Sequence, residues 1–304
     1  MLLFFKKLIY FLVIYLCLLP NFIFFYRKTL NNNHKINKKN LREKGFFLLN
    51  NELLKNEKEF ILSIINKLDI NAIINNQDTN TDPKGASNYV IDLLKSNHLS
   101  FNEKYQIKNS ILKNKKLTDE ISATLGFKSF PISINLMINH FNKDNIEFEG
   151  PKQWHRDNSA AAGQVKVFFI LNKIKKDTGG HFYYLPLSAV EPYKKFFLKK
   201  DYDNRIRLWN RYRYRDDEIK KFKDFKGDIQ VYPSNNDDLA DILVINTNDC
   251  YHKGGYIKKE GCYRLLLHIV FDPALSFTDQ GGNSFLKKIF TYSKNTFREK
   301  ISLE

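Results

Sequence analysis

Cysteine is scarce in this chain: Cys17, Cys250 and Cys262 are the only three among 304 residues. They are too few and too widely spaced for the disulfide framework that stabilises small secreted domains. Cys17 also lies inside an apolar N-terminal run, far from the other two. Cysteine usage therefore gives no reason to expect an oxidising compartment.

Acidic residues are outnumbered, with 33 Asp and Glu against 49 Lys and Arg, which gives a net charge of +16. Such a balance can indicate a nucleic-acid or anionic-membrane partner. Dense blocks of five or six basic residues are lacking, however, and the lysines are scattered among many Asn and Ile residues. The base composition of the gene can produce such a bias, so we predict no nucleic-acid partner. The apolar fraction of 43% is enough for a packed core.

The N-terminal residues 8–26 are almost wholly apolar and have nearly the length that a helix needs to cross a bilayer. A small-x-small cleavage site does not follow them. We therefore predict that residues 1–26 hold a single-pass membrane anchor, with export after signal cleavage as the alternative. More basic residues follow this run than precede it, which favours a cytoplasmic location for the rest of the chain. Residues 27–40 are polar and rich in Asn and Lys, which predicts a flexible stem.

Residues 41–150 show alternating signals for helices and strands. The spacing of the apolar residues predicts strands that belong to a sheet and helices that pack against it. The expected strands are Phe46–Leu49 and 130–141, and the expected helices are 51–68, 89–95, 103–113 and 117–125. Asn135 or Asn139 could face a binding site, although an exposed strand face is the simpler interpretation.

His155 and Asp157 are two residues apart, so on a strand their side chains project to the same face. An imidazole beside a carboxylate forms two corners of a metal site. His252 lies 95 residues beyond Asp157, just after the strand-like run 241–248. Two His and one carboxylate leave three positions open on iron, as non-haem Fe(II) oxygenases require. A structural His–Asp pair and a buried structural His252 remain the alternatives.

Several runs together resemble the phytanoyl-CoA dioxygenase family of Fe(II)/2-oxoglutarate oxygenases. They are LREKGFFLL, WHRD, KVFFIL, TGGHFYYLP, ADILVINTNDCYHKGG and CYRLLLHIVF, and they cover roughly residues 41–272. The resemblance implies a mainly β fold with flanking helices, a double-stranded β-helix (jelly roll, cupin-like), over residues 41–304. It also implies a lid insertion at about 189–226. The chain departs from the family after Pro186, where the expected Gly and His are missing. The resemblance therefore does not define the shape of the active-site rim.

The same resemblance implies a set of site residues. His155, Asp157 and His252 would hold Fe(2+), and Arg264 would bind the distal carboxylate of 2-oxoglutarate with its forked guanidinium. Oxidative decarboxylation would release succinate and CO2 and hydroxylate an unactivated C–H bond. Family members that halogenate lack the carboxylate, so the presence of Asp157 favours hydroxylation.

A turn centred near residue 259 would place His252 and Arg264 on neighbouring antiparallel strands, both facing the interior. Gly254 stands where close relatives often have a hydroxyl, so one contact to the co-substrate must come from elsewhere. His268 has the same parity as Arg264, and we interpret it as a core histidine.

The substrate is left open as a small molecule or a lipid-like compound. Residues 191–225 are basic and aromatic, which is compatible with a lid, a membrane-facing surface or, less well, a nucleic-acid interface. Two alternatives to the oxygenase are a non-catalytic, membrane-tethered jelly-roll binding module and a zinc hydrolase that uses the same three ligands.

Overall fold

A computed structural model describes eight stretches of the chain. They are residues 32–76, 90–126, 129–141, 153–157, 164–175, 177–190, 229–233 and 241–273. The predicted membrane segment 8–26, residues 191–226 of the predicted lid and the C-terminal residues 274–304 lie outside them. Among the helices of the described stretches, none is long and apolar enough to cross a membrane.

The larger of two antiparallel sheets has six strands in the order β1-β7-β4-β9-β3-β2. Its strands are β1 (Phe46–Leu49), β2 (Val90–Asp92), β3 (Ser129–His140), β4 (Val165–Ile170), β7 (Ile242–Ile245) and β9 (Tyr263–Pro273). Central strands such as β7, with the sequence Ile-Leu-Val-Ile, are buried on both faces and consist of β-branched and aliphatic residues. Both faces of this sheet are therefore covered.

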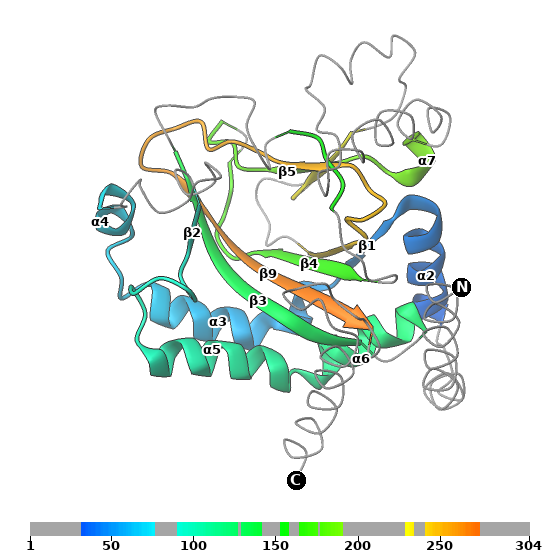
Figure 1. The fold of residues 1–304 in the computed structure, drawn as a ribbon, viewed down its shortest axis with the longest axis horizontal. Helices are drawn as coiled ribbons and strands as arrows, with labels where there is room; N and C mark the ends of the chain where they lie inside the picture. The colour runs from blue at the N-terminus through cyan, green and yellow to red at the C-terminus, as the bar shows by residue number, and fades with distance from the viewer. Residues whose placement is uncertain are drawn as a thin grey trace, which may run out of the picture.

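The smaller sheet has three strands in the order β6-β5-β8. They are β5 (Phe182–Tyr184), β6 (Gln230–Tyr232) and β8 (His252–Gly254). Figure 1 shows β5 on one side of the larger sheet, with helices α3 (Lys55–Ile65) and α5 (Phe101–Lys113) on the other. The predicted architecture, antiparallel sheets with helices alongside, is confirmed.

Other helices in the described stretches are η1 (Asn51–Leu54), α4 (Ile70–Asn75), α6 (Lys115–Leu125) and α7 (Leu187–Val190). Local signals set their ends. Ser100 and Glu103 form a reciprocal capping box at the start of α5. Asn114 caps the first turn of α6, and Gly126, with φ at +81°, ends it.

Alternation along β4 separates two hydrophobic clusters. Val165, Val167 and Phe169 pack in the cluster on the helical side, whereas Phe168 and Ile170 pack in the cluster between the sheets. β9 and β3 divide in the same way. The polar residues that share the inter-sheet parity are Lys166 on β4, Arg264 and His268 on β9, and Asn135 and Asn139 on β3. The pleat thus directs five polar side chains toward one space.

Two predicted segments differ in the structure. Residues 32–40, expected as part of a flexible stem, belong to helix α2 (Asn32–Lys44). His34 on α2 contacts Glu120 of α6 at 2.9 Å, so tertiary contacts order a segment whose composition favours disorder. Residues 89–95, expected as a helix, contain strand β2, because Val90–Asp92 pair with Asn139–Met137 of β3. Pairing with a neighbouring strand outweighs the local helical preference.

Candidate metal centre

Backbone pairing brings the two histidines of the predicted metal site together. His155 and His252 form an isolated antiparallel bridge, in which each backbone N–H donates to the carbonyl of the other, at 3.0 and 2.9 Å. The Asp157 N–H donates to the Thr247 carbonyl at 2.8 Å. The segment that carries His155 and Asp157 is therefore attached to the end of β7 and the start of β8, although it is a bridge and not the regular strand that was predicted.

The three side chains converge on one point. His155 Nε2 lies 3.9 Å from Asp157 Oδ1, and His252 Nε2 lies 3.7 Å from Asp157 Oδ2. The centroids of the two imidazole rings are 4.3 Å apart. One donor atom from each residue lies within 4.8 Å of the others, so the three residues could hold a metal ion.

Backbone carbonyls orient both imidazoles. His155 Nδ1 contacts the Gln153 carbonyl at 2.7 Å, and His252 Nδ1 contacts the Cys250 carbonyl at 3.1 Å. Because a carbonyl only accepts hydrogen bonds, each Nδ1 carries the proton and each Nε2 has its lone pair directed toward Asp157. Metal-binding histidines are commonly held in this tautomer by such a partner.

The donor set fits a divalent metal ion of the first transition row. Ligand atoms about 2.1 Å from such an ion can be at most about 4.2 Å apart. The two Nε2–carboxylate separations, 3.9 and 3.7 Å, fall inside that limit. Two imidazoles and one carboxylate on one face are the ligand set of non-haem Fe(II) sites.

Lys166 belongs to the same cluster and was missed in the sequence analysis. Its Nζ lies 2.5 Å from Asp157 Oδ2, and both side chains are mostly buried. Burial raises the pKa of the Asp157 carboxyl, but the ammonium of Lys166, the nearby imidazole of His252 and hydrogen bonds from Lys166 and Thr247 outweigh it. The net pKa is well below its usual range. A lysine at an inward position of an apolar strand was the available signal.

Arg264 is buried and held by neutral oxygen atoms. Its Nη1 donates to the Gly180 carbonyl at 2.6 Å, and its Nε and Nη2 donate to Asn139 Oδ1 at 3.1 and 2.9 Å. Gly180 has φ at +86°, and a Cβ at this position would lie 2.5 Å from Ile257 Cδ1. The loop that contains Gly180 is therefore packed closely against Ile257, and its carbonyl accepts from the guanidinium.

The predicted relation between His252 and Arg264 is wrong in one respect. They do not lie on neighbouring strands: β8 pairs with β5 in the smaller sheet, whereas β9 pairs with β4 and β3 in the larger one. The chain passes from one sheet to the other between them. Because the two sheets face each other, both residues still lie on the inner side.

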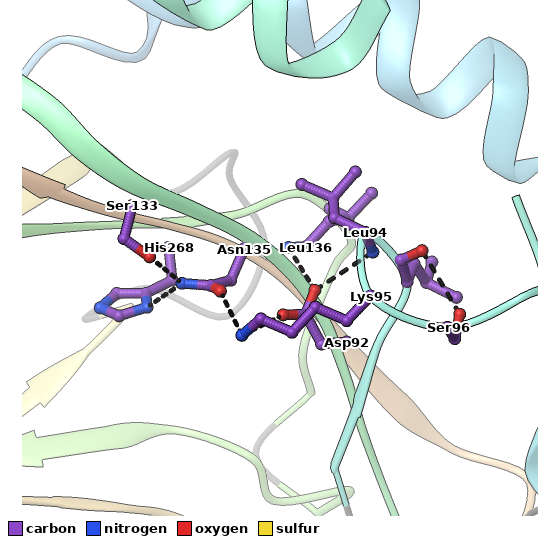
Figure 2. A network of polar contacts seen from close by, with 9 residues as sticks. Asp92, Leu94, Lys95, Ser96, Ser133, Asn135, Leu136 and His268 are labelled. Carbon is purple, nitrogen blue, oxygen red and sulfur yellow. Dashed lines mark hydrogen bonds and ion pairs between the residues drawn. The ribbon is translucent and has the colours of Figure 1, made fainter. Parts of the chain in front are cut away.

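Aromatic rings connect the metal cluster to β9. Phe182 stacks on His252 with ring centroids 5.5 Å apart, Phe168 lies 4.7 Å from Phe182, and His268 stacks on Phe168 at 5.0 Å. Figure 2 shows a chain of contacts from His268 to Asn135 and from Asn135 to Lys95, on the face of β3 and β9 that points away from the helices. Asn135 and Asn139 are both buried, so the interpretation of either as an exposed strand residue is wrong.

Comparison with solved structures supports this description of the fold. EctD from S. alaskensis with 2-oxoglutarate and 5-hydroxyectoine has 10% identity and a TM-score of 0.52, covering 83% of this chain and 80% of that one. The epimerase SnoN in complex with Fe3+, alpha ketoglutarate and nogalamycin RO has 11% identity and a TM-score of 0.51, covering 84% and 89%. The carbocyclase SnoK has 12% identity and a TM-score of 0.50, covering 84% and 90%.

The chain has the fold of the Fe- and 2-oxoglutarate-dependent oxygenases. The predicted jelly roll is thereby confirmed. Neither the protein-family models nor the curated proteins include a match to this sequence. The finer resemblance to the phytanoyl-CoA dioxygenase family stays a hypothesis.

Proposed function

We propose that this protein is an Fe(II)- and 2-oxoglutarate-dependent oxygenase. One observation carries the proposal: His155, Asp157 and His252, from segments far apart in sequence, place their donor atoms within 4.8 Å of one another between the two sheets. Apolar side chains at these three inward-facing positions would serve a packed core equally well. Three metal-binding side chains in this space therefore indicate a metal centre.

Arg264 is proposed to bind the distal carboxylate of 2-oxoglutarate. A guanidinium recognises a carboxylate through two parallel N–H bonds, and Asn139 and the Gly180 carbonyl hold this one in a buried position. EctD and SnoN, which share the fold, were crystallised with 2-oxoglutarate and alpha ketoglutarate. These features support the assignment of the co-substrate.

Iron and 2-oxoglutarate, when bound, would activate O2, which is the oxidant that attacks an unactivated C–H bond, while 2-oxoglutarate is oxidised to succinate and CO2. In such a site, His155, Asp157 and His252 would hold the ion on one face and leave the opposite face for ligands. Phe182 stacks on His252, and Phe168 packs against Phe182. These apolar neighbours of the cluster favour a small-molecule or lipid-like substrate. Hydroxylation with release of succinate and CO2 is the specific reaction that we propose.

Succinate release tests the proposal. Purified protein with Fe(2+), 2-oxoglutarate and oxygen should form succinate, and Asp157→Ala should abolish it, whereas Asp177→Ala, an exposed aspartate outside the cluster, should have no effect. Hydrolytic activity that persists without oxygen and 2-oxoglutarate would favour the zinc hydrolase instead. Metal binding without turnover on any lipid or small-molecule panel would favour the non-catalytic binding module.

Membrane attachment through residues 8–26 and a cytoplasmic location stay predictions from the sequence. Alkaline carbonate extraction of cell membranes tests attachment, because an integral anchor remains with the lipid whereas a cleaved signal leaves a shorter chain in the soluble fraction.

A further inference from the structure

His268 carries a polar atom that the proposed function does not yet use. The side chain is buried in the middle of β9, and its Nε2 has no hydrogen-bond partner among the residues that the structure describes. An unpaired polar nitrogen in this position costs free energy, since buried polar groups are normally bonded. The nitrogen therefore suggests a ligand.

The hydrogen-bond chain of Figure 2 determines which nitrogen of His268 carries the proton. Lys95 Nζ pairs with Asp92 at 2.9 Å and donates to Asn135 Oδ1 at 2.9 Å. An ammonium only donates, so the amide oxygen of Asn135 must face Lys95 and its NH2 group must face His268 Nδ1, at 3.3 Å, and Ser133 Oγ, at 3.1 Å. Nδ1 is then the acceptor, and the neutral ring carries its proton on Nε2.

Burial keeps this ring neutral. Desolvation, assisted by the nearby positive charge of Lys166, lowers the pKa of His268 to about 3. At neutral pH the ring thus presents a fixed N–H donor and no positive charge.

The position of His268 indicates what this donor meets. Arg264 and His268 lie on the same face of β9, and Val270, two residues further, pairs with Lys166, whose ammonium contacts Asp157. His268 is therefore placed along the strand between the guanidinium and the metal cluster. Packed rings also connect His268 to the cluster, because His268 stacks on Phe168, Phe168 packs against Phe182, and Phe182 stacks on His252. A dicarboxylate that spans from the metal to Arg264 would run along this face of β9.

We propose that the Nε2–H of His268 donates a hydrogen bond to the metal-proximal carboxylate of bound 2-oxoglutarate. This inference rests on the proposed function, because it assumes that 2-oxoglutarate lies between the metal and Arg264. His268 acts as a binding residue, and Asn135 and Lys95 are positioning residues that select its tautomer. The chain lacks a hydroxyl at Gly254, two residues beyond His252, and this donor supplies one further contact to the co-substrate.

Three substitutions separate the two nitrogens of His268. Gln places an amide near the position of Nε2 and keeps a donor toward the ligand. Asn places its polar group near Nδ1, so it can still bond Asn135 but cannot reach the ligand. Phe keeps the stacking on Phe168 and removes both polar contacts. A matched control is His34→Phe, on α2, which removes a histidine that contacts Glu120 far from the inter-sheet space.

The experiment is calorimetric titration of 2-oxoglutarate into the Mn²⁺-loaded full-length protein. Since a hydrogen bond to a charged group contributes about 1.5–3 kcal/mol, His268→Phe and His268→Asn should weaken binding roughly 10- to 100-fold. The dissociation constant of His268→Gln for 2-oxoglutarate should stay within about threefold of the wild-type value. Mn²⁺ affinity, titrated separately, should be the same in all of them and in the control.

Wild-type affinity in His268→Asn, or equal weakening in Gln and Asn, would overturn the inference. If His268→Phe does not fold, the comparison of 2-oxoglutarate affinity between His268→Gln and His268→Asn still tests the inference. A wild-type protein that binds Mn²⁺ but not 2-oxoglutarate would overturn the proposed function itself, and so the two failures are distinguishable.

Discussion

Lys166 and Asp157 form an ion pair inside the candidate metal centre, at 2.5 Å. The lysine ammonium occupies one oxygen of the carboxylate that would bind the metal, while Oδ1 faces His155. The pair therefore compensates the buried carboxylate when the cation is not bound, and it competes with the cation for the same oxygen. We therefore expect Lys166 to lower the metal affinity of the proposed site without being a ligand.

Lys166→Met should tighten Mn²⁺ binding, because the competing ammonium is removed. The same change should destabilise the metal-free protein by about 2 kcal/mol, because it leaves a mostly buried carboxylate without its ion pair. Metal titration and urea unfolding with and without Mn²⁺ measure the two effects. Lys173→Met, at an exposed position, is the control. Unchanged Mn²⁺ affinity in Lys166→Met would contradict the competition.

The lowered pKa of His268 makes stability depend on pH. Its pKa is about 3 in the folded protein, below the ordinary value of about 6.5 in an unfolded chain. Between these values the unfolded state binds a proton that the folded state does not, so this contribution to stability falls as pH falls from 6.5 toward 3. At pH 5 the loss should reach about 2 kcal/mol relative to pH 7.

Urea unfolding of wild type and His268→Asn at pH 7, 6 and 5 measures this contribution. The variant has no titrating group at this position, so the stability difference between the two proteins should change with pH in the stated direction. A difference that stays constant from pH 7 to pH 5 would show that the folded ring is not protected from protonation.

At the scale of elements, the connection before β5 and the turn between β8 and β9 together hold Arg264. Gly180 donates its backbone N–H to the Tyr256 carbonyl at 2.6 Å, while its own carbonyl accepts from Arg264 Nη1. Gly179 forms an isolated bridge with Ile257. The position of the guanidinium thus depends on two loops that are 75–80 residues apart in sequence.

Gly180→Ala should lower stability by about 2 kcal/mol and weaken 2-oxoglutarate binding. The positive φ is unfavourable for alanine, and the new Cβ would collide with Ile257 and displace the carbonyl that Arg264 contacts. Gly261→Ala is a matched control, because its φ is also positive, at +74°, but no described atom lies within 4 Å of the added Cβ. It should cost only about 1 kcal/mol and leave binding unchanged. Unfolding and calorimetric titration of both variants make the comparison.

For the molecule as a whole, the candidate metal centre joins separate parts of the chain. His155 and Asp157 precede β4, whereas His252 begins β8 in the smaller sheet. A cation bound by all three residues binds only the folded chain with full strength, since the unfolded chain does not hold them together. Ligand binding to the native state then stabilises the whole fold.

Mn²⁺ at 100 times its dissociation constant should stabilise the wild type by about 2.7 kcal/mol. The midpoint temperature of thermal unfolding should rise by several degrees when Mn²⁺ is added. This rise should be lost in Asp157→Ala and kept in Asp177→Ala. Equal stabilisation of wild type and Asp157→Ala would mean that the ion binds elsewhere on the molecule.

Much of this architecture follows from the sequence itself. Alternation in β3, β4 and β9 assigns one set of residues to the helical core and the other to the inter-sheet space, because side-chain direction in a strand repeats every two residues. The same rule places His155 and Asp157 on one side, and these two residues and His252 are the candidate metal ligands that the structure brings together. Strands such as Phe46–Leu49 and helices such as Phe101–Lys113 were predicted almost to the residue.

Only the tertiary structure decided which distant groups meet. Residues 32–44 became a helix and Val90–Asp92 a strand through packing and pairing that no local pattern contains. Contacts from Lys166 to Asp157, from Arg264 to Asn139 and from Asn135 to His268 each join residues on different segments. The physical reason is that periodicity encodes the direction of a side chain, whereas its partner depends on strand order and sheet closure, which are set by the packing of the entire chain.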